Sequence, residues 1–385
     1  MECNRQFFNI NVMKHLVSFS AFICSLILLS SCSGTRQKVV FKETFEFDTL
    51  AISIDFPYLS YYHTTAMYAK GDGLYWGGYN HLMHSVDIFS LTDQCAVESI
   101  ELEPEGPDAI LKNRVGSFMF NDSLLIFRGY ENEIKMIDRK YRTLYRKVVP
   151  FTTEKKYRLV CKGLLPGQFE GGNAMRLYNN TIVTPVYPDG DPTMEDVLVT
   201  SVNLNNGYVE HLPVSYPKYM EEDLSKYGSL TYPYLTVSAD RLVYNFPYTS
   251  HVYVYNVKSG KTETFSLESG KTGNRSGQKP QTDSRDYLKG FEYESMALRF
   301  CETYYDEESG ALVRVHHKEK DTPVDKDVSF LMVHKSETGE TFEYPLPSGF
   351  TTRYYVHGGN VYFQLNSGSD DKVCFAVAKI RALCE

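Results

Sequence analysis

The sequence predicts an all-β fold: a six-bladed β-propeller, closed by a strand from the N-terminal region. The main observation is a turn that leads into an apolar strand six times. The first apolar positions of these strands are Leu74, Leu124, Ile182, Leu242, Leu312 and Val361. Their spacings are 50, 58, 60, 70 and 49 residues. One supersecondary unit repeated at about this period is typical of propellers.

A second recurring piece follows most of these strands, and it consists of an alternating strand, a turn and another strand. It occupies residues 85–102, 133–149, 198–214, 252–267 and 331–346. Gly207, Gly260 and Gly339 stand in three of the turns, where a tight hairpin needs positive φ. Together the two pieces give the four strands of one propeller blade.

The two ends of the chain predict how the ring closes. The last repeat, Val361 to Ala382, lacks an outer strand, while Val39 to Ile54 reads as a strand region without a repeat of its own. An N-terminal strand that completes the final blade would remove the free edge. Seven blades, with one degenerate blade in Lys271 to Glu294, is the alternative.

Outside these strands the pattern predicts little regular structure. Glu268 to Gly290 is polar, rich in Gly and Ser, and nearly free of apolar residues, so we expect a mobile loop there. No sustained helical periodicity follows residue 32, although Met220 to Tyr227 could form one short helix.

Composition narrows the class of partner. The formal net charge is −8, and this acidic balance argues against nucleic acid, which needs a concentrated basic surface. Tyr is abundant at 30 residues, whereas Trp is single. The simpler interpretation places the tyrosines in the sheets; stacking on a sugar or peptide is the other. Cys95, Cys161, Cys301, Cys374 and Cys384 are widely spaced, which fits neither a disulfide framework nor a zinc site.

The N-terminal region predicts export. Met13-Lys14-His15 is a positive start, and Leu16 to Leu29 is an apolar run of about 14 residues, short of the roughly 20 that span a bilayer. Leu29-Ser30-Ser31-Cys32 resembles the lipobox of bacterial lipoproteins. That resemblance implies a signal peptide at 1–31, lipidation of Cys32 with palmitate among its chains, and a tether at 32–38. The propeller would then be a single domain at 39–385.

The resemblance to a lipobox also implies a cellular location. Ser33 follows the cysteine where Asp would favour retention at the inner membrane, so we expect the outer membrane of a Gram-negative bacterium. No acidic cluster follows Cys32, which favours the periplasmic face over the cell surface.

The first blade holds two motifs, Gly77-Gly78-Tyr79-Asn80-His81 and Ser85-Val86-Asp87-Ile88, with Glu105 to Ile110 after them. These motifs resemble a family of Bacteroides-type lipoproteins, the domain of unknown function DUF4221. Arg299 to Arg314 is similar to a tyrosine-and-acid turn before a late blade of the family. The resemblance implies a propeller-like lipoprotein and leaves its activity open.

Four residues of the first blade are the candidate ligand-binding set. Trp76 and Tyr79 stand beside His81 and His84, and this aromatic and imidazole cluster could line a propeller mouth. Core packing of Trp76 is the competing interpretation. We predict no metal here, because histidines at this spacing on a strand do not share one face.

No other motif predicts chemistry. Asp189, Asp191, Glu195 and Asp196 crowd one loop, but they lack the order of a calcium loop, and Pro192 interrupts the run. No nucleophile elbow, phosphate loop or dinucleotide fingerprint occurs, so we predict no cofactor.

Two function hypotheses remain. The first is a non-enzymatic binding or scaffold module, anchored to a membrane by its lipid, with an unidentified protein or glycan partner. The second is a hydrolase or lyase acting on glycan or peptide, which would require several acids, histidines or arginines converging at one mouth of the channel.

Overall fold

The structure is a computed structural model in which strands follow one another around a ring. It describes residues 38–106, 109–112, 115, 117–122, 124–128, 133–138, 143–148, 157–159, 175–188, 192–280, 287–366, 368 and 370–385. The predicted signal peptide and Cys32 lie outside these residues. Contacts divide the chain after Lys38, so that Val39–Glu385 form one compact unit, which holds every strand described below.

The described strands form six sheets, each built mainly from consecutive antiparallel strands. The first sheet contains β3 (Thr65–Lys70), β4 (Gly73–Asn80), β5 (Ser85–Ser90) and β6 (Cys95–Glu101). The second contains β7 (Ser117–Phe120), β8 (Leu124–Arg128), β9 (Glu133–Asp138) and β10 (Thr143–Val148). The third contains β11 (Tyr157–Leu159), β12 (Arg176–Tyr178), β13 (Thr181–Pro188), β14 (Val199–Asn203) and β15 (Val209–His211).

The other three sheets take strands from both ends of the chain. The fourth sheet contains β16 (Tyr234–Ser238), β17 (Arg241–Asn245), β18 (His251–Asn256) and β19 (Lys261–Ser266). The fifth contains β20 (Arg299–Asp306), β21 (Ala311–His317), β22 (Ser329–Lys335) and β23 (Thr341–Pro345), together with β1 (Val39–Phe41). The sixth contains β24 (Phe350–His357), β25 (Asn360–Leu365) and β26 (Lys372–Lys379), together with β2 (Asp48–Ser53).

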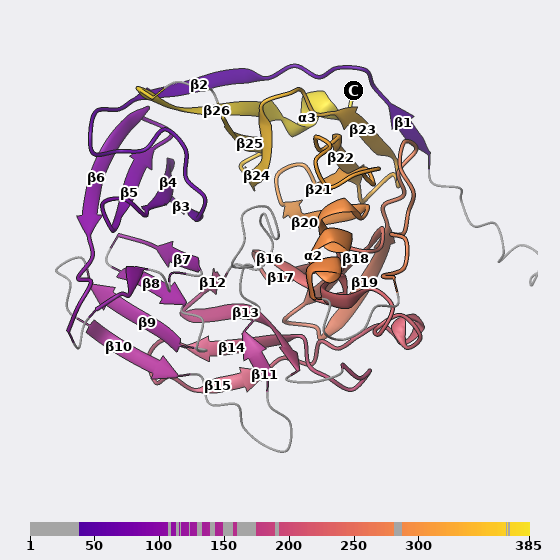
Figure 1. Ribbon diagram of the computed structural model, residues 1–385, viewed down its shortest axis with the longest axis horizontal. Coiled ribbons are helices and arrows are strands. Elements are labelled where there is room, and N and C mark those ends of the chain that lie inside the picture. Colours follow the sequence, from indigo (N-terminus) through magenta and orange to yellow (C-terminus); the bar gives the residue numbers. More distant parts are fainter. Residues whose placement is uncertain are drawn as a thin grey trace, which may run out of the picture. The chain divides into compact units, whose positions relative to one another are not determined.

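The sheets follow one another around a common centre, which confirms the predicted all-β propeller (Figure 1). Each of the six predicted apolar positions falls in the strand that pairs with the innermost strand of its sheet: β4, β8, β13, β17, β21 and β25. The turn glycines Gly207, Gly260 and Gly339 have φ of 65°, 67° and 72°, as the hairpin interpretation required. The strands nearest the centre are β3, β7, β12, β16, β20 and β24 (Figure 1).

The N-terminal segment closes the ring, as the sequence predicted. β2 pairs antiparallel with β26, with Asp48 opposite Val377 and Ser53 opposite Lys372, and so supplies the missing outer strand of the last sheet. The sequence did not reveal that this segment holds two strands. The earlier strand, β1, pairs in parallel with β23 of the preceding sheet.

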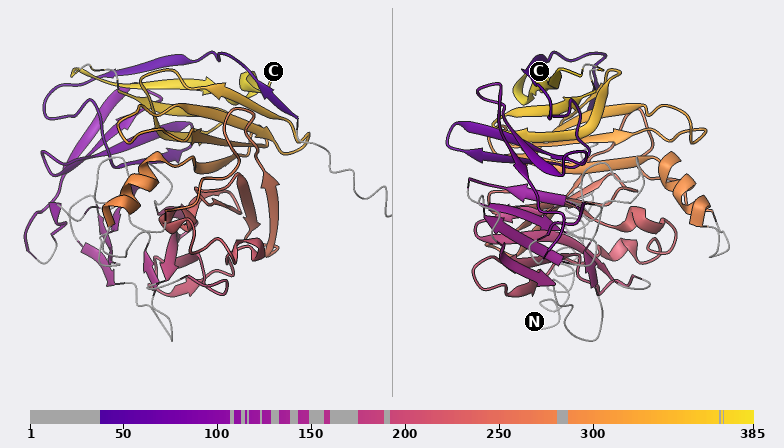
Figure 2. Two further views of the ribbon diagram at one scale, coloured as in Figure 1. Left: turned by 45° about the vertical axis from the view of Figure 1, so that its right-hand side comes forward. Right: turned by 60° about the vertical axis from the view of Figure 1, so that its left-hand side comes forward.

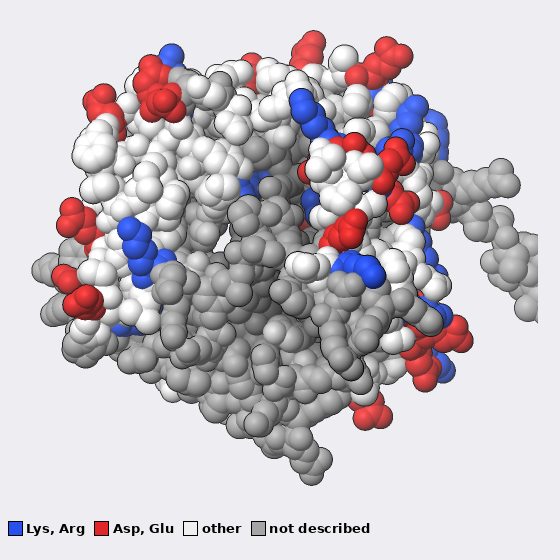
Figure 3. Space-filling model, in the orientation of Figure 1, with Lys and Arg blue, Asp and Glu red and all other residues white. Residues whose placement is uncertain are grey.

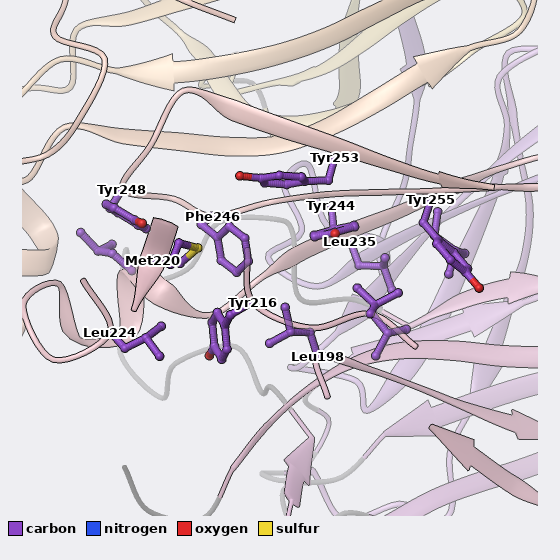
Figure 4. Packing of buried hydrophobic residues seen from close by; sticks show 14 of the residues in the cluster. Leu198, Tyr216, Met220, Leu224, Leu235, Tyr244, Phe246, Tyr248, Tyr253 and Tyr255 are labelled. Atoms are coloured by element: carbon purple, nitrogen blue, oxygen red, sulfur yellow. The ribbon is translucent and has the colours of Figure 1, made fainter. Parts of the chain in front are cut away.

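Apolar packing seals each junction between neighbouring sheets. Six buried clusters occur among the described residues, and each one combines residues of two adjacent sheets. Between the third and fourth sheets the filling is largely aromatic, with Tyr216, Tyr244, Phe246, Tyr248 and Tyr253 buried (Figure 4). These tyrosines belong to the core, as the simpler interpretation of the composition predicted.

Free thiols and short helices complete the unit. Cys301, Cys374 and Cys384 are buried free thiols. The predicted helix at Met220 to Tyr227 is displaced, since a 3-10 turn, η2, spans Lys218–Met220. A second turn, η3, spans Gly228–Thr231, and the short helix α3 spans Ile380–Leu383 near the chain end.

The predicted loop at Glu268 to Gly290 is partly wrong. Helix α2 (Tyr287–Met296) begins inside it and stands off from the strands (Figure 2). The sequence missed this helix because its residues carry only a weak apolar face. The part before residue 281 is held by backbone hydrogen bonds, since Ser250 N donates to Asn274 O at 3.0 Å and Ser276 N donates to Tyr248 O at 2.9 Å.

The closing strand provides a test of the ring. Ile52 of β2 is fully buried against the first sheet, whereas its neighbour Ser53 is exposed. We expect Ile52→Ala to lower the free energy of unfolding by roughly 2–5 kcal/mol, because it leaves a cavity at the junction that closes the ring. Ser53→Ala, the control, should change it by less than about 0.5 kcal/mol in denaturant unfolding. Equal small effects would contradict the closure.

Candidate functional site

The innermost strands of all six sheets line one pocket in the channel. Its volume is about 350 Å³, near the lower end of small-molecule sites. Its walls are mostly apolar and aromatic, and no carboxylate stands among these described lining residues. They are Thr65–Ala69 of β3, Leu74 of β4, Phe118–Phe120 of β7, Met175–Leu177 at β12, Val237 of β16, Tyr304 of β20 and Tyr355–His357 of β24.

The pocket opens at the end of the ring where the first strand of each sheet turns into the second. Ala69 and His357 lie at the ends of β3 and β24, and both are exposed there. Thr65 and Ala66, at the start of β3, are buried and lie deeper. Figure 3 shows the opposite end of the ring, where helix α2 leads into the start of β20 (Figures 1 and 3).

Arg176 supplies a cation inside this apolar channel. From β12 its side chain reaches Tyr304 of β20 and interacts with Tyr355 of β24, which belong to other sheets. One guanidinium nitrogen, Nη1, donates to Met175 O at 3.2 Å. Burial lowers the pKa of Arg176, but Tyr304 and Glu302 together raise it above its usual value. Arg176 is therefore charged at neutral pH, and it keeps exposed surface within the pocket.

Two hydroxyl groups lie beside this cation. Tyr304 Oη donates to Glu302 Oε1 at 2.9 Å, and Glu302 is buried behind the tyrosine. Tyr355 Oη and Thr65 Oγ1 are 2.8 Å apart and share one hydrogen. Burial raises the pKa of Tyr304 well above its usual value and that of Tyr355 to about 12. Both phenols are therefore neutral donors.

The four residues that the sequence selected do not form one site. Trp76 is fully buried, with its ring 5.2 Å from that of Phe375 at the junction with the last sheet. Tyr79 lies on the other face of β4, where its hydroxyl group is 2.7 Å from His84 Nδ1. His84 is buried in the turn after β4, at φ 57°, and burial lowers its pKa, while His81 is exposed in that turn. The two histidines are hairpin-turn residues that do not converge.

No sequence motif indicated the polar and aromatic residues that line the pocket. Arg176, Tyr355 and Tyr68 stand six residues before Ile182, Val361 and Leu74, three of the recurring apolar positions. Superposing the repeats would have placed them on the innermost strands. Their meeting point depends on ring closure, which a motif search within one blade does not detect.

The acidic loop is only partly described. Asp189 and Asp191 lie outside the described residues. Asp196 accepts from Thr193 N at 2.7 Å and Thr193 Oγ1 at 3.2 Å, which is the geometry of a capped turn. In the part of the chain that the structure describes, no group of three or more His, Cys, Asp or Glu is arranged to hold a metal ion.

A second buried polar cluster joins the fourth and fifth sheets. Glu343 of β23 is fully buried, and Oε1 accepts from Ser269 Oγ at 2.5 Å. Gly270 N donates to Oε2 at 2.9 Å, and His316 Nε2 lies 3.0 Å from Oε1. Because Ser269 donates to the carboxylate and not to the imidazole, the cluster is not a serine–histidine–acid relay.

The charge in this cluster resides on the carboxylate. Burial raises the pKa of Glu343, but the contacts with His316 and Ser269 outweigh this effect and hold the pKa below its usual value. Burial lowers the pKa of His316. At neutral pH the imidazole is therefore neutral and the carboxylate is ionised, so the contact between them is not an ion pair.

A ring of antiparallel sheets around a pocketed channel defines the class of this chain as a β-propeller domain. The sequence profile of the family described as "Domain of unknown function (DUF4221)" matches residues 39–335. The chain belongs to this family, as the motifs of the first blade predicted. A comparison with curated proteins finds none that matches it.

Two solved structures share the fold. A member of the DUF4221 family from Bacteroides vulgatus has 14% sequence identity and a TM-score of 0.69, covering 88% of this chain and 98% of that one. The "Putative exported protein" from Bacteroides fragilis has 12% identity and a TM-score of 0.54, covering 89% of this chain and 99% of that one. These likenesses support the propeller architecture.

Glu343 gives a pH-dependent test of the second cluster. Its pKa is lower in the folded state than in the unfolded state, so its stabilisation is present above the unfolded-state pKa of about 4.3 and is lost as the pH falls through the folded-state value. We expect Glu343→Gln to lower the free energy of unfolding by about 2 kcal/mol at neutral pH, and by less in acid.

Denaturant unfolding at neutral pH and below about pH 4 would measure this difference. The control, Glu337→Gln, changes an exposed carboxylate in the turn before β23 and should have little effect. An equal loss for Glu343→Gln at both pH values would attribute the effect to shape and not to charge.

Proposed function

We propose that this protein is a non-enzymatic binding module, held at a membrane by a lipid on Cys32, whose channel binds a small molecule. The pocket carries this proposal: all six innermost strands contribute to an apolar cavity of about 350 Å³ that holds one guanidinium. Such a mostly apolar cavity with few converging polar groups is typical of a ligand site. The protein or glycan partner expected from the sequence stays a prediction.

A lipid anchor and localisation to the outer membrane are part of the same proposal. The relative from Bacteroides fragilis carries an exported description in its name. Within the described residues, no helix has the length and apolar character needed to cross a bilayer. The lipobox-like tetrapeptide that ends at Cys32 supports anchoring by lipid at the outer membrane, with the periplasmic face favoured over the cell surface.

The pocket mouth and the start of the propeller share one end of the ring. Val39 pairs with Thr341, the first residue of β23, and that strand begins at the end where the pocket opens. A tether of seven residues reaches about 25 Å when extended. In this proposal, a lipid on Cys32 therefore lies within that reach of Val39, the first residue of the propeller.

We also propose that the six sheets are six blades, against the alternative of seven. Each sheet contributes its innermost strand to the channel, and six apolar clusters pair neighbouring sheets. The segment Lys271 to Glu294, where a degenerate blade was considered, contains the helix α2 and no described strand.

The hydrolase or lyase hypothesis gains no supporting observation from the pocket. Those reactions use acids and bases placed at the reacting atoms. The charged or imidazole side chains among the described lining residues are Arg176 inside and His357 at the rim. The carboxyl group of Glu302, which accepts from the Tyr304 hydroxyl, is buried.

Lipidation is directly testable. We expect palmitate to label the wild type in a Gram-negative host and to leave Cys32→Ala unlabelled, because the thiol is the acylated group. Cys95→Ala, which removes an exposed cysteine of the propeller, should be labelled like the wild type. Equal labelling of the wild type and Cys32→Ala, read by autoradiography, would remove the anchor.

Ligand binding in the channel is testable by blocking its mouth. Ala69 lines the mouth and is exposed, so Ala69→Trp fills the entrance with little effect on the core. We expect fluorine NMR of the neutral probe para-fluorobenzyl alcohol to show line broadening with the full chain in detergent, and Ala69→Trp to remove it. The control, Ala51→Trp, places the same side chain at an exposed position of β2. Equal broadening for both variants would refute channel binding.

A further inference from the structure

We propose that the channel ligand is a small apolar or aromatic molecule that carries one carboxylate, bound by Arg176 with a hydroxyl of the Thr65–Tyr355 pair. This inference rests on the proposed binding of a small molecule in the channel and specifies its chemical class. Three features of the pocket lead to it: the position of the guanidinium, the remaining hydroxyl donor and the apolar walls.

The guanidinium presents positive charge to the pocket. Arg176 lines the cavity and keeps exposed surface there, while Glu302, the acid that interacts with it, is buried and bound by the Tyr304 hydroxyl. The Tyr304 oxygen can accept from Arg176 because its own hydrogen goes to Glu302. This contact orients the guanidinium, whose five N–H donors exceed the acceptors of Met175 and Tyr304.

The hydroxyl pair supplies a second donor. Thr65 Oγ1 and Tyr355 Oη are 2.8 Å apart, and each oxygen carries one hydrogen. One hydrogen lies in the shared bond, so the other stays available for a ligand in the pocket that both residues line. Tyr355 also interacts with Arg176, which places this donor near the guanidinium. A carboxylate has two oxygens and matches a guanidinium and a hydroxyl together.

The walls fit an apolar body. Tyr68 and Phe120 lie with their rings 6.0 Å apart on one side, and Met67, which is only partly buried, adds a flexible thioether that adapts to different shapes. A volume of about 350 Å³ holds a molecule the size of an arylalkanoate and excludes a long polymer chain. Burial among these side chains strengthens the contact between a carboxylate and Arg176.

The experiment compares two probes that differ only in charge. Para-fluorohydrocinnamate carries the carboxylate, and para-fluorohydrocinnamamide replaces it with a neutral amide. Fluorine NMR titration of the full chain in detergent, with a detergent blank, gives both affinities. We expect the wild type to bind the carboxylate roughly 10- to 100-fold more tightly than the amide, because it makes charge-assisted hydrogen bonds.

Variants assign the preference to Arg176. Arg176→Gln should remove the difference between the two probes, and Arg176→Lys should keep part of it, because a lysine retains the charge without the planar fork. Arg381→Gln, which removes an exposed arginine near the C-terminus, should bind like the wild type. Thermal unfolding of each variant establishes that it is folded.

The outcomes separate the ligand class from the proposed function. Equal affinity of the wild type for carboxylate and amide overturns the class, whereas channel binding stands if Ala69→Trp abolishes binding of the neutral alcohol. A preference that survives in Arg176→Gln also overturns the proposal. The proposal is also overturned if acetate displaces the probe as effectively as the arylalkanoate does, since that result indicates an anion site without an apolar pocket.

Discussion

Closure of the ring by β2 is the interaction on which the rest of the structure depends. A sheet edge that ends at β26 would leave a row of unpaired backbone groups, and β2 pairs with it from Asp48 to Ser53. The same strand inserts Ile52 into the junction with the first sheet, beside Trp76 and Phe375. Closure therefore fixes β24 against β20 and β3. Those strands place Tyr355, Tyr304 and Thr65 around Arg176.

The first sheet shows why the family motifs have the residues they have. A Cβ on Gly78 would overlap the Tyr62 ring, and one on Gly77 would crowd Phe120 of the second sheet. The Tyr62 hydroxyl donates to the buried carboxylate of Asp87 at 2.6 Å, and Asn80 Nδ2 donates to the same oxygen at 2.9 Å. These motif residues thus hold a junction of the ring and do not line the pocket.

The sequence predicted the fold better than the site, and the reason is physical. Alternation and turn glycines act over a few residues, so the recurring strands from Leu74 to Val361 and the closure by Val39 to Ile54 were accessible from the pattern. The division of that segment into β1 and β2 was not, because it depends on which edge each strand meets. Helix α2 has too weak an apolar face to be recognised. The pocket combines residues of seven strands that belong to six sheets, and no local window of the sequence contains it.

The contrast between Trp76 and Arg176 explains where a ligand can bind in this ring. Large side chains of the middle strands fill the junctions between sheets, and Trp76 is fully buried in one of them. The innermost strands converge on the axis, where their side chains cannot fill the space between six sheets, and a cavity remains. A guanidinium placed there keeps partners on one side and a cavity on the other. The apolar side chains that remain around this cavity suit the hydrophobic body of a small molecule.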